Sequence, residues 1–270
     1  MELMLLFKAL ILGIVEGATE FLPISSTGHL IVVGDLLHFN DGRGKVFEIV
    51  IQLGAILAVC WEYRRKIGQV ATSVTVDKAS QRLLLNLFLA FLPAALLGLA
   101  FHHQITTYLF SPITVAWALI VGGVAILVIE RWAPQVDTPT MDGMDWKHAL
   151  KIGLAQALAL FPGVSRAGAT ILGGMVFGLS RQAATEFSFF LAIPVMFAAT
   201  IFDLINSRGL LAWSDFSMFA VGFVTAFFAA LIAVKSLLRY VAHHDFRPFA
   251  WYRLVLGVLV MGWMAWRLSR

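Results

Sequence analysis

The fold is decided by one stretch, Gly13-Ile-Val-Glu-Gly-Ala-Thr-Glu-Phe-Leu-Pro-Ile-Ser-Ser-Thr-Gly-His29. It stands inside an apolar segment that runs from Leu3 to Leu37, yet it carries two carboxylates, a proline and several hydroxyls. Non-helical backbone at membrane depth is tolerated only inside protein or beside a water-filled cavity. The stretch therefore predicts a helix, a break at Pro23 and a second helix, which together form a re-entrant hairpin.

The composition of the chain supports a membrane setting. Of its 270 residues, 60% are hydrophobic and 13% are charged, whereas a soluble domain carries about 25% charged residues. This excludes a water-soluble globule and intrinsic disorder. The formal charge of +4 is small and forms no basic face, which excludes a nucleic-acid-binding protein. We therefore predict an all-α polytopic membrane protein.

Apolar segments of sufficient length predict the membrane spans. A spanning helix needs roughly 20 mostly apolar residues. Segments that meet or approach this length are Val46–Trp61, Leu83–Phe101, Phe110–Ile129, Phe187–Ile205, Phe216–Val234 and Phe249–Trp266. A further apolar region, Ala149–Leu179, is interrupted by Pro162-Gly-Val-Ser-Arg-Ala-Gly-Ala-Thr170. It predicts a second re-entrant hairpin.

The two hairpins resemble each other in sequence. Glu16 aligns with Gln156, and Ser26 aligns with Ser165 after a one-residue deletion before the proline. We expect one integral membrane domain made of two repeats, residues 1–135 with a hairpin at 2–38 and residues 136–270 with a hairpin at 147–179. Each repeat adds three spans, so the second is inverted, and the site is expected between the repeats.

The basic residues predict the orientation. Most of them fall in loops on one side of the predicted topology, namely Arg64, Arg65, Lys66, Lys78, Arg82, Arg131, Lys147, Lys151, Arg181, Lys235, Arg239 and Arg247. Because cytoplasmic loops are enriched in Lys and Arg, that side is expected to be cytoplasmic and both termini to face outward. Arg166 and Arg253 remain inside apolar segments, where ionisable groups indicate function.

The first hairpin holds candidates for catalysis. Glu16 and Glu20 are four residues apart and share one face of a helix. They could hold a divalent metal, act as an acid/base pair, or form a structural ion pair with Arg166 or Arg253. Ser26 could be a nucleophile.

His29 follows that serine by three residues, so it shares a helix face and could serve as the base. Thr27 adds a hydroxyl for phosphate binding. The alternative is that these hydroxyls only cap the second helix.

The second hairpin holds candidates for anion binding. Backbone N–H groups at a helix start favour an anion, and Arg166 adds a fork of donors that matches phosphate. Ser165 and Thr170 could donate further hydrogen bonds. The spacing of a Walker loop is absent from this motif. The alternative is an arginine that merely neutralises Glu16 or Glu20.

Both motifs closely resemble the signatures of the bacitracin-resistance-type undecaprenyl-diphosphate phosphatases. The similarity extends over essentially the whole chain, including Glu48-Ile-Val-Ile-Gln-Leu-Gly54 and Tyr252-Arg253. One departure is Ala167, where members of the family often carry Ser. That hydroxyl is therefore not expected to be needed here.

The resemblance implies an enzyme of the bacterial inner membrane that converts undecaprenyl diphosphate to undecaprenyl phosphate. This would recycle the lipid carrier of peptidoglycan synthesis, confer bacitracin resistance and require Mg²⁺ or Ca²⁺. Carried over position by position, the family's functional residues are Glu16, Glu20, Ser26, His29, Arg166 and Thr170, with Arg253 as a further diphosphate ligand. The rival hypothesis is a transporter or flippase of a polyprenyl phosphate. The sequence does not decide whether the protein forms a homodimer.

Overall fold

The computed structural model describes residues 2–39, 42–109, 111–132, 135–207 and 215–268. In these residues the chain is helical, and its extended backbone pairs only in an isolated bridge between Thr138 and Leu179. The main helices are α1 (Glu2–Thr19), α2 (Ser26–Leu36), α3 (Gly42–Glu62), α4 (Arg64–Ser73), α5 (Lys78–Gln104), α6 (Pro112–Trp132), α7 (Trp146–Gln156), α8 (Arg166–Val176), α9 (Arg181–Ser207), α10 (Phe216–Val241) and α11 (Arg247–Leu268). The all-α prediction is confirmed.

Short helices of other types complete the chain. The π-helix η1 (Ile105–Leu109) follows α5, and the 3₁₀-helices η2 (Met141–Gly143) and η3 (Ala157–Leu160) flank and extend α7. In η3 the tighter winding closes the first arm of the second hairpin, just before Pro162. The regular α-helix therefore ends about one turn before the break that Pro162 predicts.

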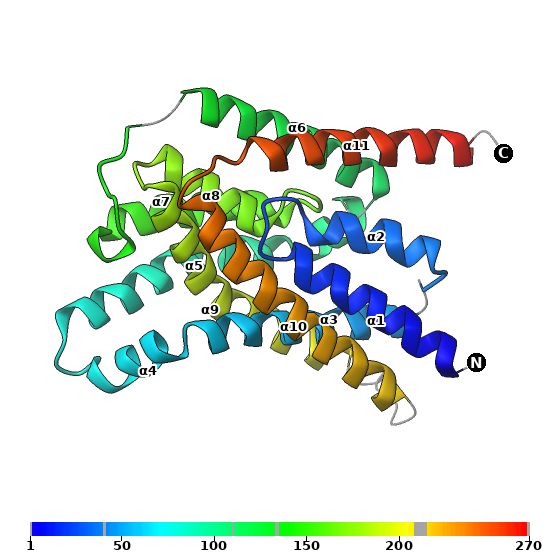
Figure 1. Cartoon of the computed structure of the whole chain (residues 1–270), viewed down its shortest axis with the longest axis horizontal. Coiled ribbons are helices and arrows are strands. Elements are labelled where there is room, and N and C mark those ends of the chain that lie inside the picture. The colour runs from blue at the N-terminus through cyan, green and yellow to red at the C-terminus, as the bar shows by residue number, and fades with distance from the viewer. Residues whose placement is uncertain (1, 40–41, 110, 133–134, 208–214, 269–270) are drawn as a thin grey trace.

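The two interrupted segments fold as hairpins. α1 and α2 lie side by side and run in opposite directions, and so do α7 and α8 (Figure 1). α1 starts at the end of the molecule where both termini lie, whereas α7 starts at the opposite end (Figure 1). The two turns therefore meet inside the helix bundle, having entered it from opposite ends.

The remaining long helices match the predicted spans. By length and composition, α5, α6, α9, α10 and α11 can each cross a membrane, and α3 with α4 makes a sixth span if the pair is counted as one. That pair bends by 72° next to Tyr63, a bend that the sequence did not predict. Among the described residues the multi-pass architecture is therefore confirmed.

Each hairpin packs against a helix of the other half of the chain. α1 lies on α10, where a Cβ on Gly17 would collide with the backbone of Ala226. α7 lies on α5, where a Cβ on Gly153 would come within 2.7 Å of the Ala90 carbonyl. Small residues permit such close approach of membrane helices. This packing fixes the two hairpin turns within one helix bundle.

Candidate active site

A cavity of about 210 Å³ lies where the two hairpin turns meet. Its polar lining comes from the two turns, from the starts of α2 and α8, and from one residue of α3, while its apolar lining comes from η3, the second turn and α9. The lining residues are Glu20, Ser25, Ser26, Thr27, Gln52, Ala159, Leu160, Phe161, Pro162, Gly163, Ser165, Arg166, Val195, Met196 and Ala199. The cavity is thus lined by both polar and apolar side chains.

The two turns end in the same backbone geometry. Ser25 (φ 69°) and Ser165 (φ 73°) both adopt the left-handed conformation, which is unusual outside glycine. Each is the N-cap of the following helix, and its hydroxyl accepts from the N–H of Gly28 or Gly168. The counterpart of Ser165 is therefore Ser25, and the alignment of Ser26 with Ser165 was wrong by one residue.

This register places two helix N-termini at one cavity. Ser25, Ser26 and Thr27 line it at the start of α2, and Ser165 and Arg166 line it at the start of α8. The N-terminus of a helix carries a partial positive charge and N–H groups that lack intrahelical partners. Together the two starts favour an anion between them.

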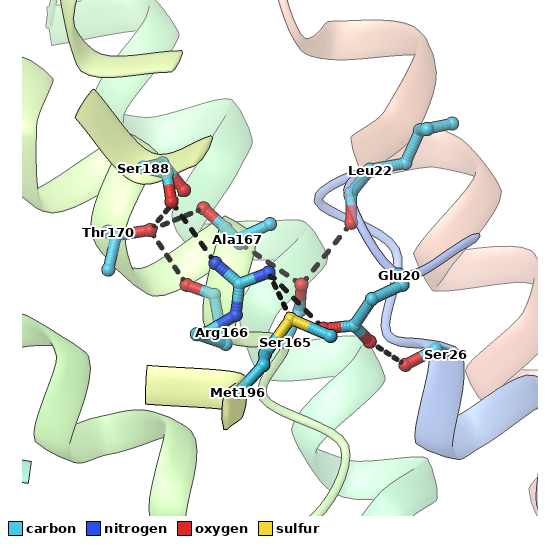
Figure 2. Close-up of polar contacts among 10 residues, drawn as sticks. Glu20, Leu22, Ser26, Ser165, Arg166, Ala167, Thr170, Ser188 and Met196 are labelled. Carbon is cyan, nitrogen blue, oxygen red and sulfur yellow. Dashed lines mark hydrogen bonds and ion pairs between the residues drawn. The ribbon is translucent and has the colours of Figure 1, made fainter. Parts of the chain in front are cut away.

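Three side chains from the two hairpins form one hydrogen-bonded chain (Figure 2). The Ser26 hydroxyl donates to Oε2 of Glu20 at 2.5 Å, and Nη2 of Arg166 donates to Oε1 of the same carboxylate at 3.2 Å. Glu20 and Arg166 are 8% and 11% exposed, so little water screens the pair. Removing one partner would leave a buried charge uncompensated, at a cost of about 3–5 kcal/mol.

Arg166 is held in place by further contacts. Nη1 donates to the Ser188 carbonyl at 3.2 Å, and Nη2 also lies 3.7 Å from Sδ of Met196. Among the described residues its Nε has no hydrogen-bond partner. The guanidinium lies 5.8 Å from the ring centre of Phe21, within cation–π range. The fork is therefore fixed at the cavity, and its Nε–H is left without a partner among the described residues.

The other predicted phosphate ligands differ in position. Ser165 and Thr27 line the cavity. Thr170 is completely buried, is absent from the cavity lining, and its hydroxyl bonds to the Arg166 carbonyl and to the Ser188 hydroxyl at 2.6 Å (Figure 2). Thr170 joins α8 to α9 and supports Arg166 from behind.

His29 points away from Ser26. Its Nδ1 bonds to the Ser25 carbonyl and its Nε2 to the Tyr252 hydroxyl, both at 2.7 Å. The two rings are stacked with centres 5.5 Å apart, and His29 does not line the cavity. The expected His29–Ser26 pair is therefore not formed, because the cap at Ser25 sets the rotation of α2. The carboxylate of Glu20 takes the place expected for the imidazole.

Glu16 lies one helical turn before Glu20 and outside the cavity lining. Its side chain is buried, and among the described residues its Oε2 has no hydrogen-bond partner. It interacts electrostatically with Glu20, Glu48 and Arg166. A buried carboxylate oxygen without a partner is the kind of donor that a hard divalent cation uses, so the donor chemistry fits Mg²⁺ or Ca²⁺.

The protein alone offers few metal ligands. In the described part of the chain no three His, Cys, Asp or Glu side chains lie close enough to hold a metal together. Mg²⁺ commonly uses one or two carboxylates and takes its other ligands from substrate phosphates and water. Glu16 and Glu20 would be sufficient for that mode of binding.

Arg253 lies behind the cavity and outside its lining. It is 1% exposed, and its hydrogen bonds go to backbone carbonyls of both hairpin turns and of α6. These bonds occupy its donors, so the structure does not bring Arg253 together with the expected phosphate ligands. The alternative of an ion pair with Glu16 or Glu20 is not formed either.

Some residues of the site were not among the candidates from the sequence. Ser25 and Met196 line the cavity, and Tyr252 holds His29. Gln52 also lines the cavity; it belongs to the Glu48–Gly54 segment that carries part of the family resemblance, and it shares a helix face with Glu48. The roles of Ser25 and Tyr252 depend on how α2 is rotated about its axis, and that rotation is set by tertiary contacts.

Comparison with known proteins places these features in a family. The family model described as bacitracin resistance protein BacA matches residues 9–259. The undecaprenyl-diphosphatase of Methylobacillus flagellatus is 62% identical over 97% of this chain and 99% of its own length. The undecaprenyl-diphosphatase of Nitrosospira multiformis is 63% identical over 97% and 96%. That of Aromatoleum aromaticum is 59% identical over 100% and 97%. The chain belongs to the bacitracin resistance protein BacA family.

Proposed function

We propose that this protein hydrolyses undecaprenyl diphosphate to undecaprenyl phosphate and inorganic phosphate. The observation that carries the proposal is the Ser26–Glu20–Arg166 chain at a cavity that two helix N-termini share. It supplies a hydroxyl, a proton acceptor and a cation within one site. The names of the relatives, undecaprenyl-diphosphatase, agree with this chemistry.

The cavity suits both ends of such a substrate. The N-termini of α2 and α8 and the guanidinium of Arg166 would bind the diphosphate. The apolar lining includes Leu160, Phe161 and Val195, and Phe161 is 48% exposed. A polyprenyl chain would pack against these side chains, whereas an inorganic diphosphate has no apolar part that would use them.

The reaction would proceed through the hydroxyl of Ser26. Its oxygen attacks the terminal phosphorus, its proton passes to Glu20, and the bond from that phosphorus to the bridging oxygen breaks. Undecaprenyl phosphate leaves, and water then hydrolyses the phosphoserine to release inorganic phosphate. Arg166 offsets the negative charge on the transferring group. In the alternative route a water molecule attacks in place of Ser26.

Substrate binding would change the partners of Glu20. In the structure Arg166 donates to Oε1 of Glu20. A diphosphate would compete for the same guanidinium. Glu20 would then keep its bond to Ser26 and accept the proton of that hydroxyl.

A divalent cation would be held by Glu16 and Glu20. When bound, Mg²⁺ or Ca²⁺ would neutralise phosphate charge and orient the phosphates. This assignment is supported by Oε2 of Glu16, which has no hydrogen-bond partner in the part of the chain that the structure describes.

The protein would act in the bacterial inner membrane with both termini outward. The basic ends of the helices support this orientation, and the product would be the recycled lipid carrier of peptidoglycan synthesis. Removal of the diphosphate would also account for bacitracin resistance.

A transporter is the second candidate, because hairpins that enter from opposite ends are typical of transporters. The two functions separate in detergent micelles, where no second compartment exists. We expect the purified protein to release inorganic phosphate from undecaprenyl diphosphate there. A protein that binds the lipid but releases no phosphate in the presence of Mg²⁺ or Ca²⁺ would be a transporter.

A further inference from the structure

The guanidinium of Arg253 has all its donors occupied by main-chain oxygens. An arginine side chain carries five N–H groups, and the structure records five bonds between 2.8 and 3.3 Å. The acceptors are the carbonyls of Pro23, Ala118, Leu119, Gly163 and Val164. None is a carboxylate. Arg253 is therefore solvated by peptide dipoles and has no donor left for a phosphate.

The acceptors lie in three separate parts of the chain. Pro23 precedes the cap at Ser25 in the first turn, while Gly163 and Val164 immediately precede the cap at Ser165 in the second. The other two carbonyls belong to α6. One side chain from α11 thus joins both hairpin turns to a third element.

These bonds also orient the peptide groups that lead into α2 and α8. The peptide bond is planar and its N–H points opposite to its C=O. Fixing the Val164 carbonyl therefore fixes the N–H of Ser165, a residue of the cavity lining. Ser165 in turn donates to the Leu22 carbonyl of the first turn at 3.4 Å, so the two turns are in direct contact.

α6 is shaped to admit the guanidinium. A Cβ on Gly122 would collide with Nη2, Cζ and Nε of Arg253. A Cβ on the neighbouring Gly123 would instead approach the Ala250 carbonyl and the Leu254 side chain, at 2.9 Å each. Both glycines allow α6 to pack on α11, but only Gly122 makes room for the arginine.

We propose that Arg253 is a positioning residue that holds the two hairpin turns in register. Through it, Ser26 and Glu20 from the first hairpin meet Arg166 from the second. It does not bind the diphosphate itself. The proposal rests on the proposed function where activity is concerned, but its geometric part is independent of the substrate.

The test compares Arg253→Lys, Arg253→Met and Gly122→Ala with Gly123→Ala as the matched control. Each purified protein is assayed for kcat, KM and melting temperature in detergent. A misplacement of about 1 Å can lower the rate about 100-fold, and we expect a fall in kcat of that order in Arg253→Met. Arg253→Lys should retain more activity than Arg253→Met, because it keeps the charge and three donors. Gly122→Ala should lose kcat although it keeps the arginine, whereas Gly123→Ala should lower only the melting temperature.

A second readout needs no substrate. Spin labels are placed at Leu36 on α2 and Leu154 on α7, both more than half exposed, in a Cys60→Ala background, and their separation is measured by pulsed electron resonance. The parent protein should give one narrow distance distribution, and Arg253→Met and Gly122→Ala should broaden or shift it. This result stands even if the protein proves not to be a phosphatase.

Three outcomes would overturn the proposal. In the first, Arg253→Met keeps the parent kcat and the narrow distribution. In the second, Gly123→Ala changes kcat and distance as much as Gly122→Ala, which reduces the effect to packing of α6 on α11. In the third, Arg253→Lys raises KM alone with the distance unchanged, which would make Arg253 a substrate ligand.

Discussion

The Ser26 hydroxyl donates a 2.5 Å hydrogen bond to Oε2 of Glu20, across the break between α1 and α2. A proline and a left-handed cap at Ser25 turn the chain so that the last turn of one helix faces the first turn of the next. A hydroxyl against a carboxylate is the arrangement that general-base activation requires. In this protein it is paired with an arginine from a hairpin that enters from the opposite end of the molecule (Figure 1).

Arg166→Lys should lose most of the activity although it keeps the positive charge. Lys lacks the planar fork, so it cannot keep its bond to the Ser188 carbonyl and also bind a phosphate through two parallel N–H groups. The measurement is kcat/KM for phosphate release. Arg82→Lys is the matched control, since Arg82 is exposed and bonds only to the Asp142 carbonyl in the described part of the chain. Near-parent kcat/KM in Arg166→Lys would reject the clamp.

Glu16→Gln should weaken the dependence of activity on Mg²⁺ or Ca²⁺. The substitution removes a hard anionic oxygen, and Oε2 of Glu16 has no hydrogen-bond partner among the described residues to explain its burial otherwise. The check is a metal titration of phosphate release, which should shift to higher concentration. Should the titration stay in place while turnover falls, Glu16 acts through Glu20 and holds no metal.

His29 and Tyr252 should behave as one unit. Their hydrogen bond joins α2 to α11, and residues in contact typically couple by about 0.5–3 kcal/mol. We expect His29→Gln and Tyr252→Phe to be non-additive in kcat/KM, with the double variant close to His29→Gln alone. Additive effects would contradict this. They would show that His29 acts independently of Tyr252, as a base whose side chain moves away from the position seen in this structure.

The orientation can be tested with single cysteines in a Cys60→Ala background. Val76 lies between α4 and α5, and Tyr108 lies in η1 at the opposite end; they are 83% and 76% exposed. An impermeant thiol reagent should label Tyr108→Cys in intact cells and leave Val76→Cys unlabelled until the membrane is opened. The predicted orientation rests only on the positive-inside bias. The reverse labelling pattern would therefore show that the protein is inserted the other way round.

Hydropathy and breaks in the sequence were enough to predict the helices and the two hairpins. Length and apolar content decide whether a helix can cross a membrane. Pro23 and Pro162 interrupt their apolar segments and so predict the turns of the two hairpins. The gathering of Glu20, Ser26 and Arg166 was also predicted, because repeated broken helices point to a shared site. Hydropathy and prolines are local features of the sequence, and the shared site follows from the similarity between the two hairpins.

Details that depend on helix phase or on distant segments could not be predicted. The alignment matched prolines, whereas the structure matches the caps at Ser25 and Ser165, which places Arg166 where the first hairpin has Ser26. The direction of His29 follows from that cap and from Tyr252, more than 200 residues away. The partners of Arg253 are backbone carbonyls. Because every residue has a backbone carbonyl, the sequence gives no sign of which ones the arginine will contact.

The covalent route through Ser26 is tested most simply by a rapid acid quench with undecaprenyl diphosphate labelled at its terminal phosphorus. We predict a transient phosphoprotein whose label maps to Ser26, no label in Ser26→Ala, and slower labelling in Glu20→Gln, because general-base loss costs about 10²–10⁴-fold. Phosphate release by Ser26→Ala at about a tenth of the parent rate or more would contradict a covalent route through this serine. Parent protein that turns over without any trapped label would contradict it as well, and would assign the attack to water.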